Sequence, residues 1–361
     1  MKQRELSLDI FRGITVAAMI LVNTPGSWQH IYAPLKHANW HGITPTDLIF
    51  PFFLFAVGNS IFFAFKDRYL NSESLFKVLK RSLILFTIGV LLNAFPFTSE
   101  FESLRLMGVL QRIAICYFVV CIFALMFSKR SIIFISVLIL LSYSVLLNLF
   151  GTDLSLENNL VRRIDLTIIG STHLYQGFGV PFDPEGLLST LPAIATTIFG
   201  FLIAHFVDRE QHNKNKLNHL LKLSLFSLLI GLALSLYIPL NKSLWTVSYV
   251  LVSGSLAIAF LTLIIWLTES KRAPMSLNWA KIYGSNPLFV YILSWLFAVT
   301  MSQIIIFEYG GKNISLYQWC FEFLSVLLPA KIASLLFATI TVVIFYYLSA
   351  YLYKKAIFIK I

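Results

Sequence analysis

Ten long apolar stretches, each of about 20 residues, set the strongest limit on how this chain can fold. As an α-helix, an apolar segment of that length crosses a bilayer hydrocarbon core of about 30 Å. Runs that alternate between apolar and polar residues, separated by regular turns, are absent, so a helical bundle is favoured over a β-barrel. The predicted spans cover residues 8–25, 46–66, 76–95, 106–127, 131–150, 186–207, 217–239, 244–267, 283–305 and 331–353.

The composition agrees with this class of protein. Of the 361 residues, 12% are charged and 58% are hydrophobic, whereas a soluble domain contains about 25% charged residues. We therefore predict an all-α integral membrane protein with about ten transmembrane helices in one bundle, forming a single domain over residues 1–361 without a soluble domain. No small-residue cleavage site follows the first apolar stretch, so it is predicted to be a retained helix rather than a signal peptide.

The distribution of charge predicts the orientation. The net charge is +11, but lysine and arginine residues collect in short connections between spans, which argues for a membrane protein and against a nucleic-acid partner. An even number of spans puts both termini on one side. A cytoplasmic N-terminus then places most of the 28 basic residues on the inner face, as the positive-inside rule predicts. Cys116, Cys121 and Cys320 form neither a disulfide framework nor a metal-ligand spacing.

Two polar connections lie on the outer face in this orientation. The first, residues 24–45, contains His30, His37 and His41, and imidazole is the side chain best suited to transfer protons near neutral pH. The second, residues 151–185, is a long structureless connector, which is typical of a functional loop or a lid. The two meet above the bundle if the first, second and sixth spans are neighbours.

Local patterns predict where helices begin and break. In Thr44–Asp47, a threonine N-cap, a proline and an acidic residue predict the start of the second span, and Asp183–Gly186 begins the sixth span in the same way. Asn286-Pro287 interrupts the ninth span. Such a break either lines a cavity or only kinks the helix.

Six segments together resemble a known family in the same order along the chain. They are RELSLDIFRGITVAAMILVNTPG from Arg4, KHANWHGITPTDLIFPFFLFAVGNSI from Lys36, GVLQRIA from Gly108, FDPEGLLSTLPAI from Phe182, PLNKSLWTVSYVL from Pro239 and GSNPLFVYIL from Gly284. This set closely resembles the catalytic membrane region of the heparan-alpha-glucosaminide N-acetyltransferase family. The resemblance covers nearly the whole chain.

The resemblance implies a transmembrane acetyltransferase. Members of this family transfer acetyl from cytosolic acetyl-CoA, which is a donor substrate, to the amino group of a terminal glucosamine across the membrane. The lysosomal member has an additional luminal domain and one preceding span, so this chain looks like a minimal form in a bacterial inner membrane. The acceptor is then an amino sugar or glycan, no metal is implied, and the family suggests a homodimer.

The same resemblance places the catalytic histidine on His37, with Asn23 and Asp47 beside it. His37 acts either as a base that deprotonates the acceptor amine or as a carrier of the acetyl group. Asn23 either closes the first helix or donates a hydrogen bond to the acetyl carbonyl oxygen. Asp47 caps the second span, orients the imidazole or holds the substrate ammonium. The loop appears longer than in the lysosomal enzyme and contains the additional His30.

Arg112, preceded by Gln111, is the most informative charge inside a span, because a buried arginine is costly in hydrocarbon. Arg105 lies seven residues earlier, two helical turns away on the same face. These residues either bind CoA phosphates or pair with an acidic residue such as Asp47. Asp9 and Arg12 are spaced as an intrahelical ion pair.

A further set of predicted substrate contacts comes from the outer loops. Asn241 and Trp245, near Lys242, form a polar and aromatic edge that either anchors the helix at the interface or stacks on sugar rings. His41 is a second candidate beside His37. Two other functions remain open: an acyltransferase that modifies another cell-envelope glycan, and a transporter of small sugars or amines. A transporter is expected to show inverted repeats, and none is detected.

Overall fold

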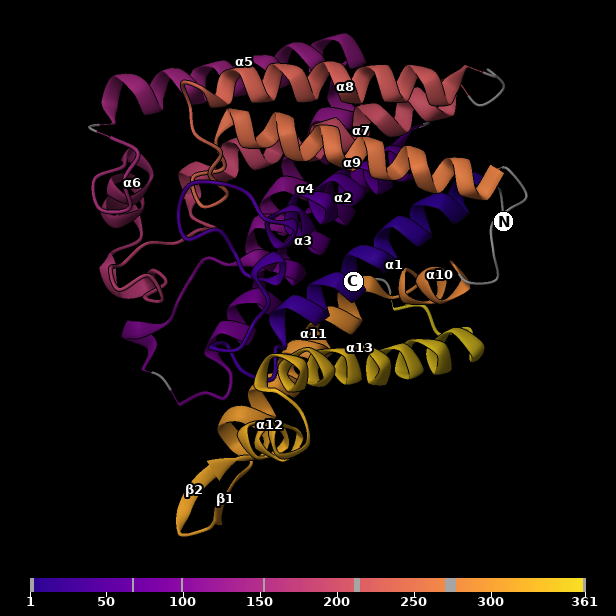
Figure 1. Ribbon diagram of the computed structural model, residues 1–361. Coiled ribbons are helices and arrows are strands. Elements are labelled where there is room, and N and C mark those ends of the chain that lie inside the picture. The colour runs from indigo at the N-terminus through magenta and orange to yellow at the C-terminus, as the bar shows by residue number, and fades with distance from the viewer. Residues whose placement is uncertain are drawn as a thin grey trace.

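The computed structural model describes residues 3–66, 68–98, 100–151, 153–210, 215–269 and 277–359, and it is a bundle of helices (Figure 1). The α-helices in the first half are α1 (Gln3–Asn23), α2 (Ile49–Phe65), α3 (Ser72–Ala94), α4 (Val109–Met126), α5 (Lys129–Phe150) and α6 (Leu160–Ile168). Those in the second half are α7 (Leu187–Arg209), α8 (Lys216–Ser235), α9 (Val247–Glu269), α10 (Asn278–Tyr283), α11 (Pro287–Val299), α12 (Leu316–Leu327) and α13 (Ala330–Lys354). Short 3-10 turns are η1 (Ala33–Leu35), η2 (Pro45–Leu48), η3 (Phe101–Ser103) and η4 (Ser171–His173), and η6 (Thr300–Ile304) is a π-helical turn.

The all-α membrane fold is confirmed, and a helix lies at each of the ten predicted spans. Within the described ranges, nine helices are long and apolar enough to cross a membrane. The helix at the third predicted span, α3, is not among these nine, and it has Lys77, Lys80 and Arg81 in its first half. A small hairpin was not predicted: β1 (Ile306–Tyr309) pairs antiparallel with β2 (Lys312–Ser315).

Several helices begin where the sequence supplies a capping side chain. Asn71 accepts a hydrogen bond from the Ser74 amide (2.7 Å) at the start of α3, and Asn159 accepts one from the Arg162 amide (2.8 Å) at α6. Ser315 accepts from the Gln318 amide (3.2 Å) at α12. These side chains satisfy backbone donors that have no partner inside the helix.

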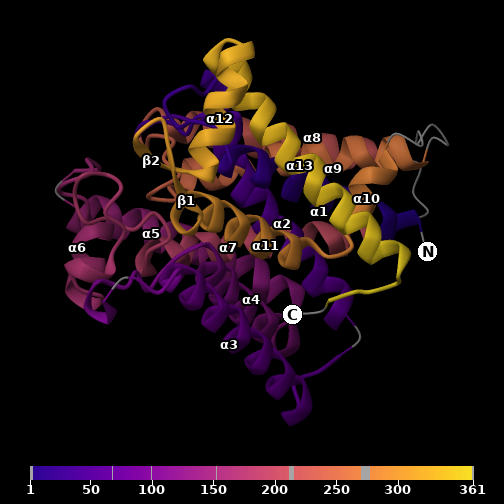
Figure 2. The same cartoon turned by 90° about the horizontal axis from the view of Figure 1, so that it is seen from below.

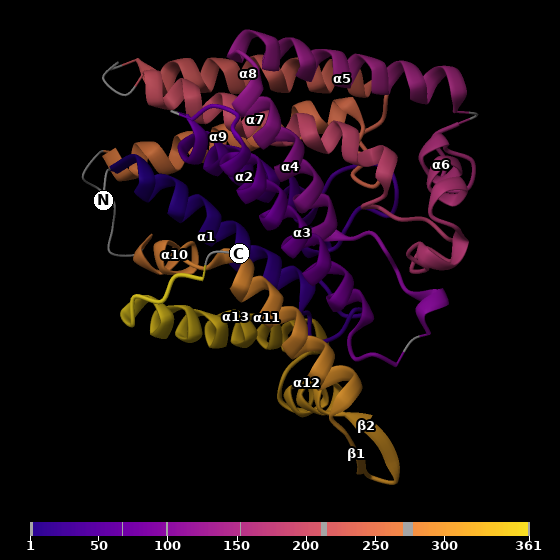
Figure 3. The ribbon, with the colours of Figure 1, turned by 180° about the vertical axis from the view of Figure 1, so that it is seen from behind.

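Helices α2 and α7 pack against each other inside the bundle (Figures 1 and 3). Two glycines lie where they cross. A Cβ atom on Gly58 of α2 would lie 1.9 Å from the Thr197 carbonyl oxygen, and one on Gly200 of α7 would lie 1.9 Å from the Phe55 carbonyl oxygen. Small residues allow helix backbones to approach this closely in membranes. The two helix backbones are therefore in close contact at Gly58 and Gly200.

The two ends of the bundle differ. The start of α1 and the end of α13 lie at one end, whereas α6, α12 and the hairpin lie at the other (Figures 1 and 2). The start of α1 and the end of α13 at one end of the bundle are what an even number of spans predicts. Parts of two predicted basic connections, residues 211–214 and 270–276, lie outside the described residues.

The predicted interruption of the ninth span is confirmed. Helix α10 ends at Tyr283 and α11 begins at Pro287. Between them, the Asn286 amide donates to the Ile357 carbonyl (2.9 Å) and accepts from the Ile359 amide (2.7 Å). The break is therefore stabilised by the segment that follows α13.

Candidate functional site

The connection between α1 and α2 folds back so that His37 meets Asp47 at the start of α2. His37 Nδ1 lies 2.6 Å from Asp47 Oδ1. The other carboxylate oxygen, Oδ2, accepts three hydrogen bonds of 3.0 Å, from the Ala38 amide, the Thr44 amide and the Thr44 hydroxyl. The predicted helix start is confirmed, and the same carboxylate contacts the imidazole.

This short contact determines which ring nitrogen of His37 carries the proton. A carboxylate oxygen and an unprotonated nitrogen are both acceptors, so a 2.6 Å separation places a hydrogen on Nδ1. Nε2 then carries the lone pair that accepts a proton. Asp47 is almost completely buried, with 2% of its side chain exposed, whereas 48% of the His37 side chain is exposed. The imidazole is therefore accessible, and the carboxylate that contacts it is protected from solvent.

Lys242, from the connection between α8 and α9, completes this group. Its Nζ lies 3.2 Å from His37 Nδ1 and 3.8 Å from Asp47 Oδ1. Burial lowers the pKa of the Lys242 ammonium, and the negative charges of Asp47 and Glu185 oppose this shift. Sequence reasoning placed Lys242 near the outer edge but did not bring it to His37, because 205 residues separate them.

A cavity of about 120 Å³ adjoins His37. Its polar lining comprises Asn23, His37, Thr46, Glu185 and Lys242. Apolar side chains close the rest of it, namely Met19, Val22, Ile49, Phe50 and Val109. Of the three predicted catalytic residues, two line this cavity, and the third, Asp47, supports the imidazole.

The two polar connections, residues 24–45 and 151–185, meet, as expected if α1, α2 and α7 are neighbours. Trp40 Nε1 donates to the Leu154 carbonyl (2.8 Å), and Glu185 reaches the His37 cavity. The prediction that residues 151–185 are structureless is wrong, because α6 and η4 lie within them. The sequence signal was Asn159, which caps α6.

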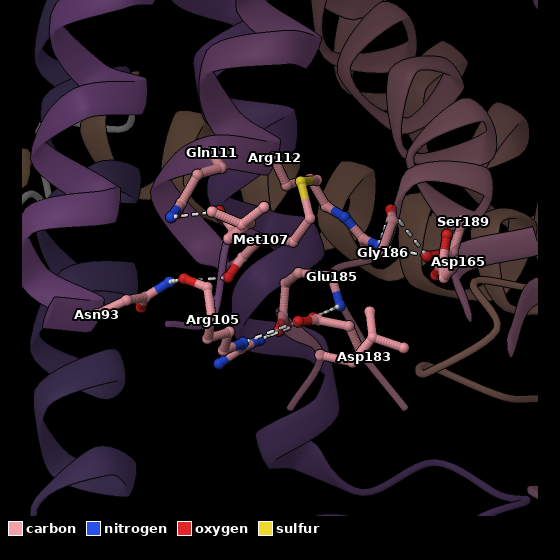
Figure 4. Close-up of polar contacts among 12 residues, drawn as sticks. Asn93, Arg105, Met107, Gln111, Arg112, Asp165, Asp183, Glu185, Gly186 and Ser189 are labelled. Atoms are coloured by element: carbon pink, nitrogen blue, oxygen red, sulfur yellow. Dashed lines mark hydrogen bonds and ion pairs between the residues drawn. The ribbon is translucent and has the colours of Figure 1, made fainter. Parts of the chain in front are cut away.

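A buried ionic cluster positions Glu185 (Figure 4). Arg105 donates from Nε and Nη2 to the two oxygens of Asp183 (2.8 Å each), and from Nη2 to Glu185 Oε2 (2.7 Å). The two-pronged contact fixes the guanidinium plane. The sequence suggested Asp47 as a partner for the arginines, which is wrong for Arg105, whose carboxylates are Asp183 and Glu185.

Arg112 is fully buried on α4 and has a different set of partners. Its Nη2 donates to the Gly186 carbonyl (3.3 Å) and to the Ser189 hydroxyl (Figure 4). Its guanidinium lies 5.0 Å from the centre of the Trp245 ring. In the described part of the chain, Nε and Nη1 have no hydrogen-bond partner. Since α4 begins at Val109, the prediction that Arg105 shares its helix face is wrong.

Gln111 and Asp165 also belong to this interior. Gln111 is buried and donates to the Leu106 carbonyl (3.0 Å), so it holds the chain before α4 rather than facing open space. Asp165 Oδ1 accepts from the Leu187 amide (3.0 Å) at the start of α7. Burial raises the pKa of Asp165 to about 7, although these backbone hydrogen bonds oppose the shift.

Asn241 and Trp245 do not form the exposed outer edge that was predicted, because both are fully buried. Asn241 donates to the Trp40 carbonyl (3.0 Å) and accepts from the Leu244 amide (2.8 Å). Trp245 Nε1 donates to the Thr196 hydroxyl (3.0 Å). His41 Nδ1 lies 3.2 Å from the Asn241 amide, and burial lowers the pKa of His41. Their contacts fix the loop that presents Lys242.

A second cavity, of about 160 Å³, lies further along α2 toward the end of the bundle where α1 begins. Two arginines line it. Arg12 is paired with Asp9, as predicted, and the Arg81 guanidinium lies 4.7 Å from the centre of the Tyr117 ring. Pro287 also lines this cavity, so the break before α11 borders a cavity rather than only kinking a helix.

The amino-acid sequence is similar to those of known proteins. Residues 4–240 match the family model described as "Heparan-alpha-glucosaminide N-acetyltransferase, catalytic". Heparan-alpha-glucosaminide N-acetyltransferase of Homo sapiens is 28% identical over 353 residues, covering 79% of this chain and 52% of the relative. The Mus musculus protein of the same name is 26% identical over 352 residues, with the same two coverages. The chain thus spans about half the length of these relatives.

Proposed function

The chain belongs to the heparan-alpha-glucosaminide N-acetyltransferase family, and from this premise we propose that it transfers acetyl from acetyl-CoA to the amino group of a glucosamine-type sugar across a membrane. The observation that carries the proposal is that one face of α2 lines both the His37 cavity and the second cavity. One contains a histidine base, and the other contains two arginines.

Helix α2 shows this alignment most clearly. Thr46, Ile49 and Phe50 line the His37 cavity. The same face continues into the second cavity through Phe53, Ala56, Val57, Ser60, Ile61 and Ala64. This spacing of three and four residues is one continuous helical stripe. Small residues along its second half leave room for a narrow ligand beside the helix.

The separation suits a long donor with a charged end. Arg12 and Asn23 lie 11 residues apart on α1, which is about 16 Å along the helix axis. CoA carries its phosphates at one end and its thioester at the other. We place the phosphates at Arg12 and Arg81, because arginine binds phosphate well. The thioester then reaches Asn23 and His37.

The arrangement at His37 supports general-base catalysis. In the proposed step, the acceptor nitrogen attacks the thioester carbonyl carbon, and His37 Nε2 takes the proton that the amine loses. The carbon–sulfur bond breaks, and CoA leaves as its thiol after protonation. Asp47 stabilises the imidazolium, and Asn23 and Lys242 lie where they can stabilise charge on the carbonyl oxygen. The rival route attaches the acetyl to Nε2 first.

The direction of transfer follows from the predicted orientation. The Arg12 cavity lies at the end of the bundle where α1 begins, near the basic residues of α3, and the His37 cavity lies at the other end. With a cytoplasmic N-terminus in a bacterial inner membrane, the donor enters from the cytoplasm. Only the acetyl group then crosses to the acceptor.

The test uses purified protein in liposomes with labelled acetyl-CoA, with and without glucosamine. We expect label on glucosamine from the wild type and none from His37→Ala. His30→Ala is the matched control, because His30 lines a different pocket and stacks on Phe321, and it should retain activity. Arg12→Gln and Arg81→Gln should each raise the KM for acetyl-CoA about tenfold without changing the KM for glucosamine.

Other outcomes separate the rival functions. Acetyl-CoA binding without transfer to glucosamine, but with transfer to another envelope glycan, would identify a different acyltransferase. Absence of acetyl-CoA binding would refute the proposal and favour a transporter.

A further inference from the structure

An open groove of about 610 Å³ adjoins the His37 cavity and shares Asn23 with it. It lies between the loop after α1, the end of α11 and one face of α12, which projects with the hairpin at one end of the bundle (Figure 1). This volume falls within the range of about 300–1,000 Å³ that is typical of ligand sites. Because Asn23 borders both, a ligand in the groove can extend into the catalytic cavity.

The walls of the groove are held by specific contacts. The Tyr317 hydroxyl on α12 donates to the Pro25 carbonyl (2.7 Å). The Gly26 amide donates to the Ser334 carbonyl (3.1 Å), and the Ser27 amide donates to the Ser334 hydroxyl (3.1 Å). These bonds join the loop after α1 to α12 and α13. The groove is therefore a built feature rather than a gap between unconnected segments.

Helix α12 is arranged so that its polar side chains face the groove. Gln318 and Glu322, one turn apart, line it and are joined by a 2.8 Å hydrogen bond from Nε2 to Oε1. Phe323, Val326 and Leu327 are exposed and do not line the groove. An amphipathic helix of this kind lies at a membrane surface with its apolar side in the lipid.

The chemistry of the lining matches a neutral or amino-bearing carbohydrate. Trp28 is 64% exposed, and it lines the groove together with Trp295 and the amide of Gln29. Aromatic rings pack against the apolar faces of sugars, and amides bind hydroxyl groups. Glu322 is the one acidic or basic side chain among the described lining residues. A lone carboxylate attracts ammonium groups and repels sulfates and carboxylates.

We propose that this groove binds the sugar units that precede the terminal amino sugar, so that the preferred acceptor is an oligosaccharide of uncharged or amino-bearing sugars rather than a sulfated chain. The inference rests on the proposed acetyltransferase function. It deepens that function by naming the class of acceptor. Part of the groove is formed by α12, which lies outside residues 4–240, the part of the chain that the family model matches.

The first experiment compares three acceptors: glucosamine, a glucosamine trisaccharide and a sulfated oligosaccharide of equal length that ends in glucosamine. We expect kcat/KM for the trisaccharide to exceed that for glucosamine at least tenfold, and the sulfated chain to gain nothing. Trp28→Ala and Glu322→Gln should each lower the ratio of trisaccharide to glucosamine kcat/KM about tenfold. Phe323→Ala, on the side of α12 outside the groove, is the control and should leave the ratio unchanged.

A binding measurement separates failure of this inference from failure of the proposed function. The trisaccharide is titrated into His37→Ala protein by calorimetry, and Trp28→Ala in the same background should weaken binding about tenfold. No trisaccharide binding, or equal binding with and without Trp28, would overturn the groove assignment. Absence of any acetyl transfer by the wild type, with intact trisaccharide binding, would overturn the proposed function and leave the groove assignment supported.

Discussion

Replacing Asp47 with asparagine tests whether its carboxylate directs the His37 proton or only caps a helix. Three donors, the Ala38 amide and the amide and hydroxyl of Thr44, hold Oδ2 at 3.0 Å. In Asp47→Asn these donors require the remaining oxygen, so the new amide nitrogen must face His37. An N–H group aimed at Nδ1 stabilises the tautomer with its proton on Nε2. The base would then have its lone pair on the wrong nitrogen.

The expected loss follows from comparable chemistry and from exposure. In serine proteases, the aspartate-to-asparagine change beside the catalytic histidine lowers kcat by about 10⁴. Because 48% of the His37 side chain is exposed, the ring has more freedom to rotate and water can replace part of the interaction. We therefore expect kcat/KM to fall by about 10³ to 10⁴, which corresponds to about 4–5.5 kcal/mol of transition-state stabilisation.

The assay is steady-state transfer from labelled acetyl-CoA to glucosamine, with thermal unfolding in detergent as the measure of folding. Asp47→Asn should unfold within a few degrees of the wild type, because the capping oxygen remains. Thr44→Val removes one hydroxyl donor to Oδ2 but leaves the His37 contact, and it should lower kcat/KM less than fivefold. Activity of Asp47→Asn within fivefold of the wild type would show that the carboxylate only caps α2.

Three further changes test other parts of the structure. Lys242→Met keeps the side-chain length but removes the charge 3.2 Å from His37, so kcat should fall about 10- to 100-fold in steady-state assays; an unchanged kcat would exclude Lys242 from catalysis. Burial raises the pKa of Asp165 to about 7, and the unfolded value is about 3.9, so the folded protein binds this proton more tightly and loses stability as pH rises from about 4 to about 7. Asp165→Asn should remove this loss, and parallel pH profiles of thermal unfolding for both proteins would contradict the assignment. Gly58→Ala places a Cβ 1.9 Å from the Thr197 carbonyl oxygen, so the unfolding midpoint should drop by several degrees; an unchanged midpoint would show that α2 and α7 can separate at little cost.

The parts of the fold that the sequence predicts are those governed by nearby residues. Apolar length decides where a helix can cross a bilayer, and all ten predicted spans contain helices. The start of α2 and the break before Pro287 follow from capping and proline chemistry within a few residues. The hairpin was missed although Gly310 and Gly311, both at positive φ, supply the turn that such hairpins favour.

Long-range contacts at the site required the structure. Asp47 lies ten residues after His37, so a single loop brings them together. Lys242 and Glu185 reach the same cavity only because α2 packs on α7 and α9. Arg105 was assigned to a helix face because the helix was extended back to it from Arg112, whereas α4 begins at Val109, and its partners lie 78 and 80 residues away. Hydrophobic patterns do not encode which spans are neighbours.

The charges around the cavity favour direct transfer over an acetyl-histidine intermediate. In direct transfer, His37 takes the N–H proton as the acceptor amine attacks the thioester carbon and passes that proton to the departing sulfur, so CoA leaves as its thiol and no separated charges remain. Attack by His37 on the thioester instead creates an acyl-imidazolium and a thiolate before the acceptor arrives. Separating charges that persist in the cavity is costly, and the acyl-imidazolium would remain 3.2 Å from the Lys242 ammonium until the acceptor arrives, whereas the imidazolium of direct transfer loses its charge within the step. We therefore expect no label on the wild-type protein when labelled acetyl-CoA is added without acceptor. Retained label that disappears in His37→Ala would refute this reasoning.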